Sequence, residues 1–64
     1  MNDVRVVGLE SVIAMTGISR ATIFRMRKAG QFPQPARLGS RALRFWLADI
    51  EAWLVARRAE GASQ

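Results

Sequence analysis

Apolar positions near the start of the chain recur with a helical period. Leu9, Val12 and Ile13 are spaced i, i+3, i+4, as on one face of a short helix. Thr16-Gly17 follows, and glycine suits the left-handed backbone position that ends many helices. The pattern predicts a first helix from about Leu9 to Thr16, without a strong N-cap residue.

A second helix is predicted directly after this turn. Ser19 is a favoured N-cap residue, and "RATIFRMRKA" then leads to Gly30. The apolar stripe of this helix is narrow, with Ile23 and Met26 in line and Phe24 beside them, so we expect it to touch the core along one edge. Two helices joined by a short glycine turn indicate a helix-turn-helix. An ordinary antiparallel helix pair has the same pattern.

The next segment, "QFPQPARLGSRALRF", predicts a β-hairpin. Its two prolines keep the preceding residues extended, and Gly39-Ser40 is typical of a two-residue turn. This turn pairs Leu38 with Arg41 and Ala36 with Leu43. One face of the hairpin then carries Leu38, Leu43 and Phe45, and the other carries Arg37, Ala42 and Arg44. A small hairpin with an arginine at its tip, placed after a helix-turn-helix, indicates a wing.

The last element, "WLADIEAWLVARR", predicts a third helix. Trp46, Ile50, Trp53 and Leu54 follow helical spacing, so we expect the tryptophans in the core. The alternative for tryptophans in a nucleic-acid-binding protein is base stacking. The fold class predicted is mainly α with a small β-hairpin: a single winged helix-turn-helix domain over residues 1–64, with 1–5 and 60–64 frayed.

Charge is distributed unevenly along the chain. Ten Lys and Arg against five Asp and Glu give a net charge of +5, and no acid occurs between residues 11 and 48. That window contains Arg20, Arg25, Arg27, Lys28, Arg37, Arg41 and Arg44. Ordinary surfaces intersperse both signs, so the window favours a polyanionic partner over a merely solvated basic surface.

The basic residues of the second helix lie at opposite ends of its dipole. Arg27 and Lys28 lie in the last turn, where cations stabilise a helix, so a structural role explains them as well as a binding role does. Arg20 lies in the first turn, where a cation is unfavourable. We therefore expect an anion from outside the chain to compensate Arg20.

Several function classes are disfavoured by missing residues. The chain has no Cys and no His, which removes thiolate ligands and the commonest general base. Asp49 and Glu51 are two residues apart on a helix and face different ways. We expect no enzyme, catalytic residue, metal or cofactor. No signal peptide or membrane span is recognisable, so a cytoplasmic, nucleoid-associated protein is predicted.

The motifs "TGISRATIFR", "G-x-FP", "RLGSRALRFW" and "DIEAWL", in this order, resemble the AlpA family of phage and prophage regulators over residues 6–58. That family is related to excisionase and MerR-like winged-helix proteins. The resemblance implies DNA binding near prophage promoters or attachment sites, with residues 19–27 as recognition helix and 37–44 as wing. Two positions depart from the family pattern. Phe24 replaces a common Tyr, and Leu47 replaces a polar residue that often opens the last helix.

The candidate interface follows from this placement. Arg25 is the best candidate for a bidentate contact with guanine, and Thr22 for a phosphate or a thymine methyl. Arg41 and Arg44 would contact the adjacent backbone or minor groove. The expected DNA-binding residues are Ser19, Arg20, Ala21, Thr22, Arg25, Arg27, Lys28, Arg37, Arg41 and Arg44.

Three functions remain open at this point. The first is a transcriptional regulator of a prophage or other mobile element, and the second is an excisionase-type factor that bends DNA. The third is a small phage adaptor that binds an acidic protein surface. We expect double-stranded DNA as the partner, with no membrane and no small-molecule ligand. A single small module buries little DNA surface, which favours self-association or cooperative binding on adjacent sites.

Overall fold

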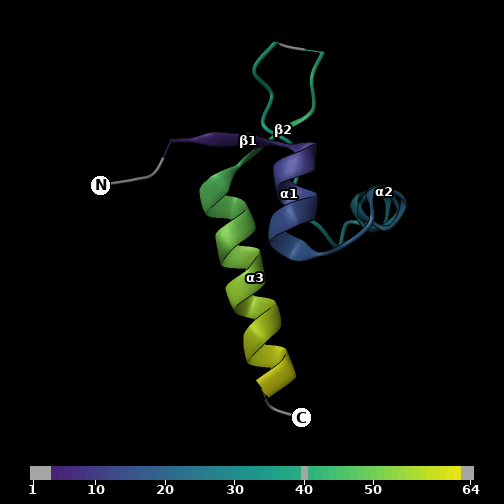
Figure 1. The fold of residues 1–64 in the computed structure, drawn as a ribbon, viewed down its shortest axis with the longest axis vertical. Coiled ribbons are helices and arrows are strands. Elements are labelled where there is room, and N and C mark those ends of the chain that lie inside the picture. The colour runs from purple at the N-terminus through teal and green to yellow at the C-terminus, as the bar shows by residue number, and fades with distance from the viewer. Residues whose placement is uncertain (1–3, 40, 63–64) are drawn as a thin grey trace.

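The computed structural model describes residues 4–39 and 41–62 and contains three helices and a two-stranded antiparallel sheet (Figure 1). The elements in chain order are β1 (Val6–Gly8), α1 (Leu9–Thr16), α2 (Arg20–Lys28), β2 (Arg44–Trp46) and α3 (Leu47–Ala62). This arrangement is a winged helix-turn-helix, which confirms the predicted fold class. The helix α3 continues to Ala62, so it reaches into the segment expected to fray.

The turn between α1 and α2 is held by local hydrogen bonds. Gly17 has a φ of 72°, and its N–H donates to the carbonyl of Ile13 at 2.8 Å. The hydroxyl of Thr16 accepts a 3.2 Å hydrogen bond from the N–H of Ile18. An L-residue with a side chain is strained at the backbone conformation of Gly17, so the predicted glycine stop of α1 is confirmed with its physical reason.

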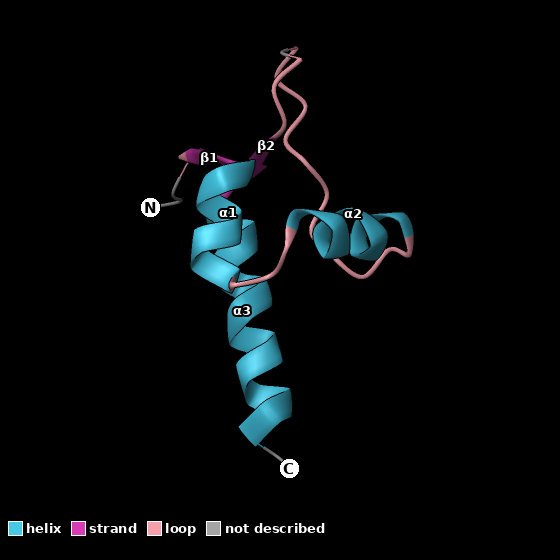
Figure 2. Ribbon diagram, turned by 45° about the vertical axis from the view of Figure 1, so that its right-hand side comes forward, coloured by secondary structure: helices cyan, strands magenta, loops and turns pink. Residues whose placement is uncertain are grey.

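The three helices are not packed equally closely against one another. The helices α1 and α3 both pack into the core, through Val12 and Ile50, and the C-terminal half of α3 extends past the end of α1 (Figures 1 and 2). The helix α2 crosses to one side of this pair, and residues 33–39 and 41–43 form a long loop that extends beyond the sheet (Figure 2). Both α2 and the loop therefore stand out from the packed body.

The core is small and draws on nearly every element. The fully buried side chains of the described residues are Val12 of α1, Ile23 of α2, Phe45 of β2 and Ile50 of α3. Phe32, from the segment after α2, completes the cluster at 4% exposure. Its ring meets that of Phe45 edge to face at 5.7 Å and lies 4.8 Å from that of Trp53. The sequence pattern did not predict Phe32 as core, because it has no periodic apolar partners.

The strand pairing differs from the predicted hairpin. The partner of β2 is β1, in the register Val6 with Trp46, Val7 with Phe45 and Gly8 with Arg44. Pairing with β1 provides hydrogen-bond partners for the backbone of β2. The strand β1 contains the β-branched residues Val6 and Val7, which favour strands. The strand β1 was not predicted from the sequence.

The predicted hairpin register is also wrong. The two arms of the wing are joined by a 2.8 Å hydrogen bond from the N–H of Ala36 to the carbonyl of Arg44, which aligns Ala36 with Arg44 and not with Leu43. Leu38, expected on the apolar underside, is 51% exposed, whereas Phe45 is buried and Leu43 half-buried. Ser40, the second residue of the predicted turn, lies outside the described residues.

The predicted tryptophan core is only partly correct. Trp46 belongs to β2 and not to α3, because the helix begins one residue later at Leu47. Ile50 is buried, whereas Trp53 and Leu54 are half-buried and pack against the core from its edge. The indole N–H of Trp53 donates to the carbonyl of Gln31 at 3.2 Å, which ties α3 to the segment after α2.

Removal of one core ring should unfold the domain. Phe45→Ala should cost about 3–5 kcal/mol, as deletions of large aromatic side chains from cores do. A chain of this size has little more stability than that in total. Phe24→Ala makes the same chemical change at a side chain that is 41% exposed, and should leave the fold intact. Circular dichroism with thermal melting checks both variants, and cooperative melting of Phe45→Ala near the wild-type temperature would refute this core assignment.

Candidate nucleic-acid interface

A chain of hydrogen bonds runs along one face of α2. Ser19 caps the helix, and its Oγ accepts from the backbone N–H of Thr22 at 3.3 Å. The Ser19 hydroxyl in turn donates to Oγ1 of Thr22 at 3.0 Å. One turn further on, Nη2 of Arg25 donates to the same Oγ1, also at 3.0 Å. The three side chains occupy positions i, i+3 and i+6, so they share a face of the helix.

This chain of bonds determines the polarity of the exposed surface. The hydroxyl oxygen of Thr22 accepts from two donors, which uses both of its lone pairs. Its own O–H therefore remains available as a donor. Arg25 is exposed and uses one of its five N–H groups in this contact. The face thus presents hydrogen-bond donors, which suit phosphate oxygens and the acceptor atoms of guanine.

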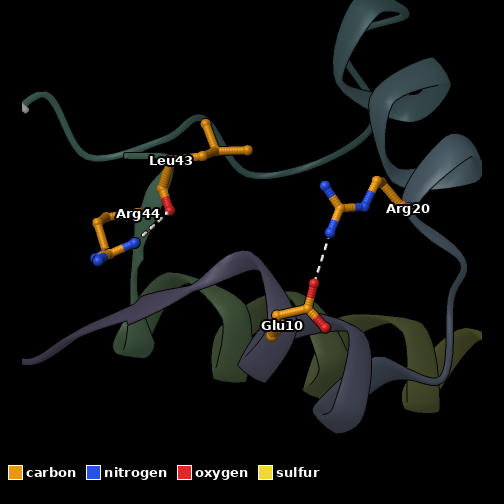
Figure 3. A network of polar contacts seen from close by, with 4 residues as sticks. All are labelled: Glu10, Arg20, Leu43 and Arg44. Atoms are coloured by element: carbon orange, nitrogen blue, oxygen red, sulfur yellow. Dashed lines mark hydrogen bonds and ion pairs between the residues drawn. The ribbon is translucent and has the colours of Figure 1, made fainter. Parts of the chain in front are cut away.

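The first residue of α2 is paired with the preceding helix. Nη2 of Arg20 lies 2.6 Å from Oε2 of Glu10, which belongs to the first turn of α1 (Figure 3). From the sequence, an anion from outside the chain was expected to compensate Arg20. The structure corrects that expectation, because a carboxylate of the same chain already occupies this role. The contact joins residues ten positions apart and has no local sequence signal.

The remaining predicted residues of α2 are arranged unequally. Ala21 and Lys28 are exposed. Arg27 is half-buried, and its guanidinium lies 5.7 Å from the ring centroid of Phe24. Nε of Arg27 is buried and has no hydrogen-bond partner among the described residues. The side chain of Arg27 therefore rests partly on the protein's own surface, and only its outer part can reach a partner.

The predicted wing arginines lie in two different elements of the structure, the loop and β2. Arg37 and Arg41 are exposed in the loop. Arg44 lies in β2 opposite Gly8, and its Nη1 donates to the carbonyl of Leu43 at 3.2 Å. A Cβ atom added to Gly8 would lie 3.3 Å from this Nη1, so the glycine leaves room for the arginine. Figure 3 shows the guanidinium of Arg44 folded back toward Leu43 and not directed toward Arg20.

An open hollow of about 550 Å³ lies between the segment after α2 and α3. The guanidinium of Arg57 lies 4.9 Å from the ring centroid of Trp53, which forms part of the wall. Arg57 is therefore engaged in a cation–π contact within the chain.

The geometry thus places an exposed, donor-rich second helix after a glycine turn, next to an arginine-bearing loop. The family described as prophage CP4-57 regulatory protein (AlpA) matches this chain over residues 5–58. The chain belongs to the AlpA family. The matched range includes β1, α1, α2, β2 and most of α3. The predicted resemblance is confirmed, and with it the assignment to a family of prophage regulatory proteins.

The chain is also similar to an uncharacterized protein, ORF88, of Enterobacteria phage P4. The two sequences are 29% identical over 53 residues. The aligned region is 83% of this chain and 60% of that relative, so the chain spans less than two thirds of the relative's length. No solved structure matches the chain.

Residues 4–39 and 41–62 contain neither a candidate metal site nor a candidate membrane-spanning helix. In these ranges no group of three or more His, Cys, Asp or Glu side chains is arranged to hold a metal ion. No helix there combines the length and the apolar character needed to cross a membrane.

The cap of α2 should contribute measurably to stability. Ser19→Ala removes the acceptor of the Thr22 N–H and should lower the free energy of unfolding by about 1 kcal/mol. Ser19→Asp retains an N-cap acceptor and should remain close to wild type. Urea titration followed by circular dichroism measures both values. Equal stability of Ser19→Ala and wild type would show that the cap does not hold the start of α2.

Proposed function

We propose that this AlpA-family protein is a sequence-specific double-stranded DNA-binding protein that regulates transcription of a prophage or other mobile element. In this proposal α2 enters the major groove, and the described wing residues 37–39 and 41–44 contact the adjacent backbone or minor groove. The observation that carries the proposal is the donor face of α2. Ser19 and Arg25 both donate to Oγ1 of Thr22, which leaves the Thr22 O–H and the other N–H groups of Arg25 as donors toward a partner.

The packing of α2 supports entry into a groove. Ile23 is the buried side chain of this helix, and Met26 is half-buried next to the core. Arg20, Ala21 and Arg25 are exposed on the N-terminal half, which is the part that contacts bases in helix-turn-helix proteins. Ala21 adds little bulk, so the backbone of the first turn can approach a base edge closely.

The electrostatics support a polyanion as the partner. The acid-free window from residue 11 to 48 covers all of α2 and the wing. Phosphate contacts by arginine and lysine release counterions and supply the affinity that does not depend on sequence. The donor face of α2 supplies the contacts that depend on sequence. We propose binding, not catalysis, as the activity.

Affinity of the purified protein for DNA at several salt concentrations tests the proposal. A preferred duplex is first selected from a pool of random sequences. With about four phosphate contacts per monomer, log K should fall with log[salt] at a slope of about −3.5. A slope near zero would remove DNA as the partner and favour an acidic protein surface. Strong bending of the selected duplex, with no effect on a reporter promoter, would favour an excision factor.

Two arginine variants separate base reading from backbone contact. Arg25→Ala should weaken binding to the selected duplex by about 1–3 kcal/mol, and weaken binding to random duplex much less. Arg41→Ala should weaken binding to both duplexes by similar factors and make the salt slope shallower by about 1. Both side chains are exposed, so both variants should melt near the wild-type temperature.

The comparison of the two duplexes decides between the roles. If Arg25→Ala weakens binding to both duplexes equally, α2 does not read sequence. The specific contacts would then have to lie in the wing.

A further inference from the structure

An acidic side chain lies directly beside the proposed DNA-reading helix. Glu10 is the last acid before the acid-free window, but the fold brings its carboxylate to the first residue of α2. Figure 3 shows Arg20 reaching down from α2 to Glu10 at the start of α1. The side chains of Arg20 and Glu10 are 59% and 81% exposed, so the pair lies at the surface.

A carboxylate at this place has a cost for DNA binding. It repels phosphates, and it cancels the charge of a nearby arginine. An exposed ion pair also contributes little to the stability of a fold. Stability of the domain is therefore a weak explanation for the contact between Glu10 and Arg20.

The pairing changes what Arg20 can do. Because its charge is balanced by Glu10, Arg20 gains little from one more contact with a phosphate. The bond to Glu10 uses one of the five N–H donors of the guanidinium and leaves the others for a second acceptor. A carboxylate that holds one side of the planar guanidinium also restricts its orientation, and bidentate recognition of a base edge depends on orientation.

We propose that Glu10 is a positioning residue for sequence recognition. It holds the guanidinium of Arg20 for a bidentate contact with the major-groove edge of a guanine, and it prevents Arg20 from acting as a phosphate contact. The inference rests on the proposed DNA binding through α2. It adds a base-reading role for Arg20 and assigns Glu10, from α1, to the recognition surface.

The test uses two variants that remove the same charge from different places. Glu10→Gln removes the partner of Arg20, whereas Glu51→Gln removes an exposed acid from α3, a helix that is not part of the proposed interface. Affinities are measured for the selected and the random duplex at several salt concentrations. Thermal melting checks that both variants remain folded.

Glu10→Gln should alter preference as well as affinity. Binding to random duplex should strengthen, and the salt slope should steepen by about 1, because Arg20 becomes free to contact a phosphate. The preference for the selected duplex should fall roughly 5- to 150-fold, the range for loss of one bidentate base contact. Glu51→Gln should strengthen binding to both duplexes by similar small factors and leave the preference unchanged.

A second pair of variants isolates the role of Arg20. In an Arg20→Gln background, a further Glu10→Gln change should no longer lower the preference. The proposal is overturned if Glu10→Gln and Glu51→Gln have equal effects on preference, or if Glu10→Gln lowers preference equally with and without Arg20. Failure of the proposed function itself is recognised separately, because wild-type protein would then select no duplex.

Discussion

One small hydrophobic cluster holds the elements of this chain together. The helices α1, α2 and α3 and the strand β2 each place one fully buried side chain in it, and Phe32 closes it from the segment after α2. A chain of 64 residues has no second core to add. The helix α2 is therefore held mainly through Ile23, with Met26 at the edge, and its opposite side remains exposed. The exposed surface that we propose for DNA is a direct consequence of this limited core.

The electrostatics of the exposed surface depend on contacts at the start of α2. Ser19 satisfies a backbone N–H there, and Glu10 balances the charge of Arg20 at the positive end of the helix dipole. Both contacts order side chains before any partner binds. A helix that is held along one edge is thus given a defined donor surface, and preorganisation of this kind lowers the entropic cost of recognition.

Local signals in the sequence predicted most of the helical architecture. The glycine stop at Gly17 and the serine cap at Ser19 were predicted correctly, because each depends on residues within one turn of it. Contacts between distant segments were not predicted. Two examples are the pairing of β1 with β2 and the contact of Glu10 with Arg20. Each joins segments that no shared pattern of apolar residues connects in the sequence. Trp46 was assigned to α3 because it lies four residues before Ile50, as on one face of a helix. In the structure Trp46 is instead the last residue of β2, directly before α3.

We propose that α2 and the wing, and not α3, form the surface that contacts DNA. Nuclear magnetic resonance of ¹⁵N-labelled protein titrated with the selected duplex distinguishes these two surfaces. We expect the largest amide shifts in residues 19–28 and in 37–39 and 41–44, with small shifts in residues 52–60 of α3. Large shifts concentrated in 52–60 and around Trp53, with α2 unchanged, would contradict this proposal.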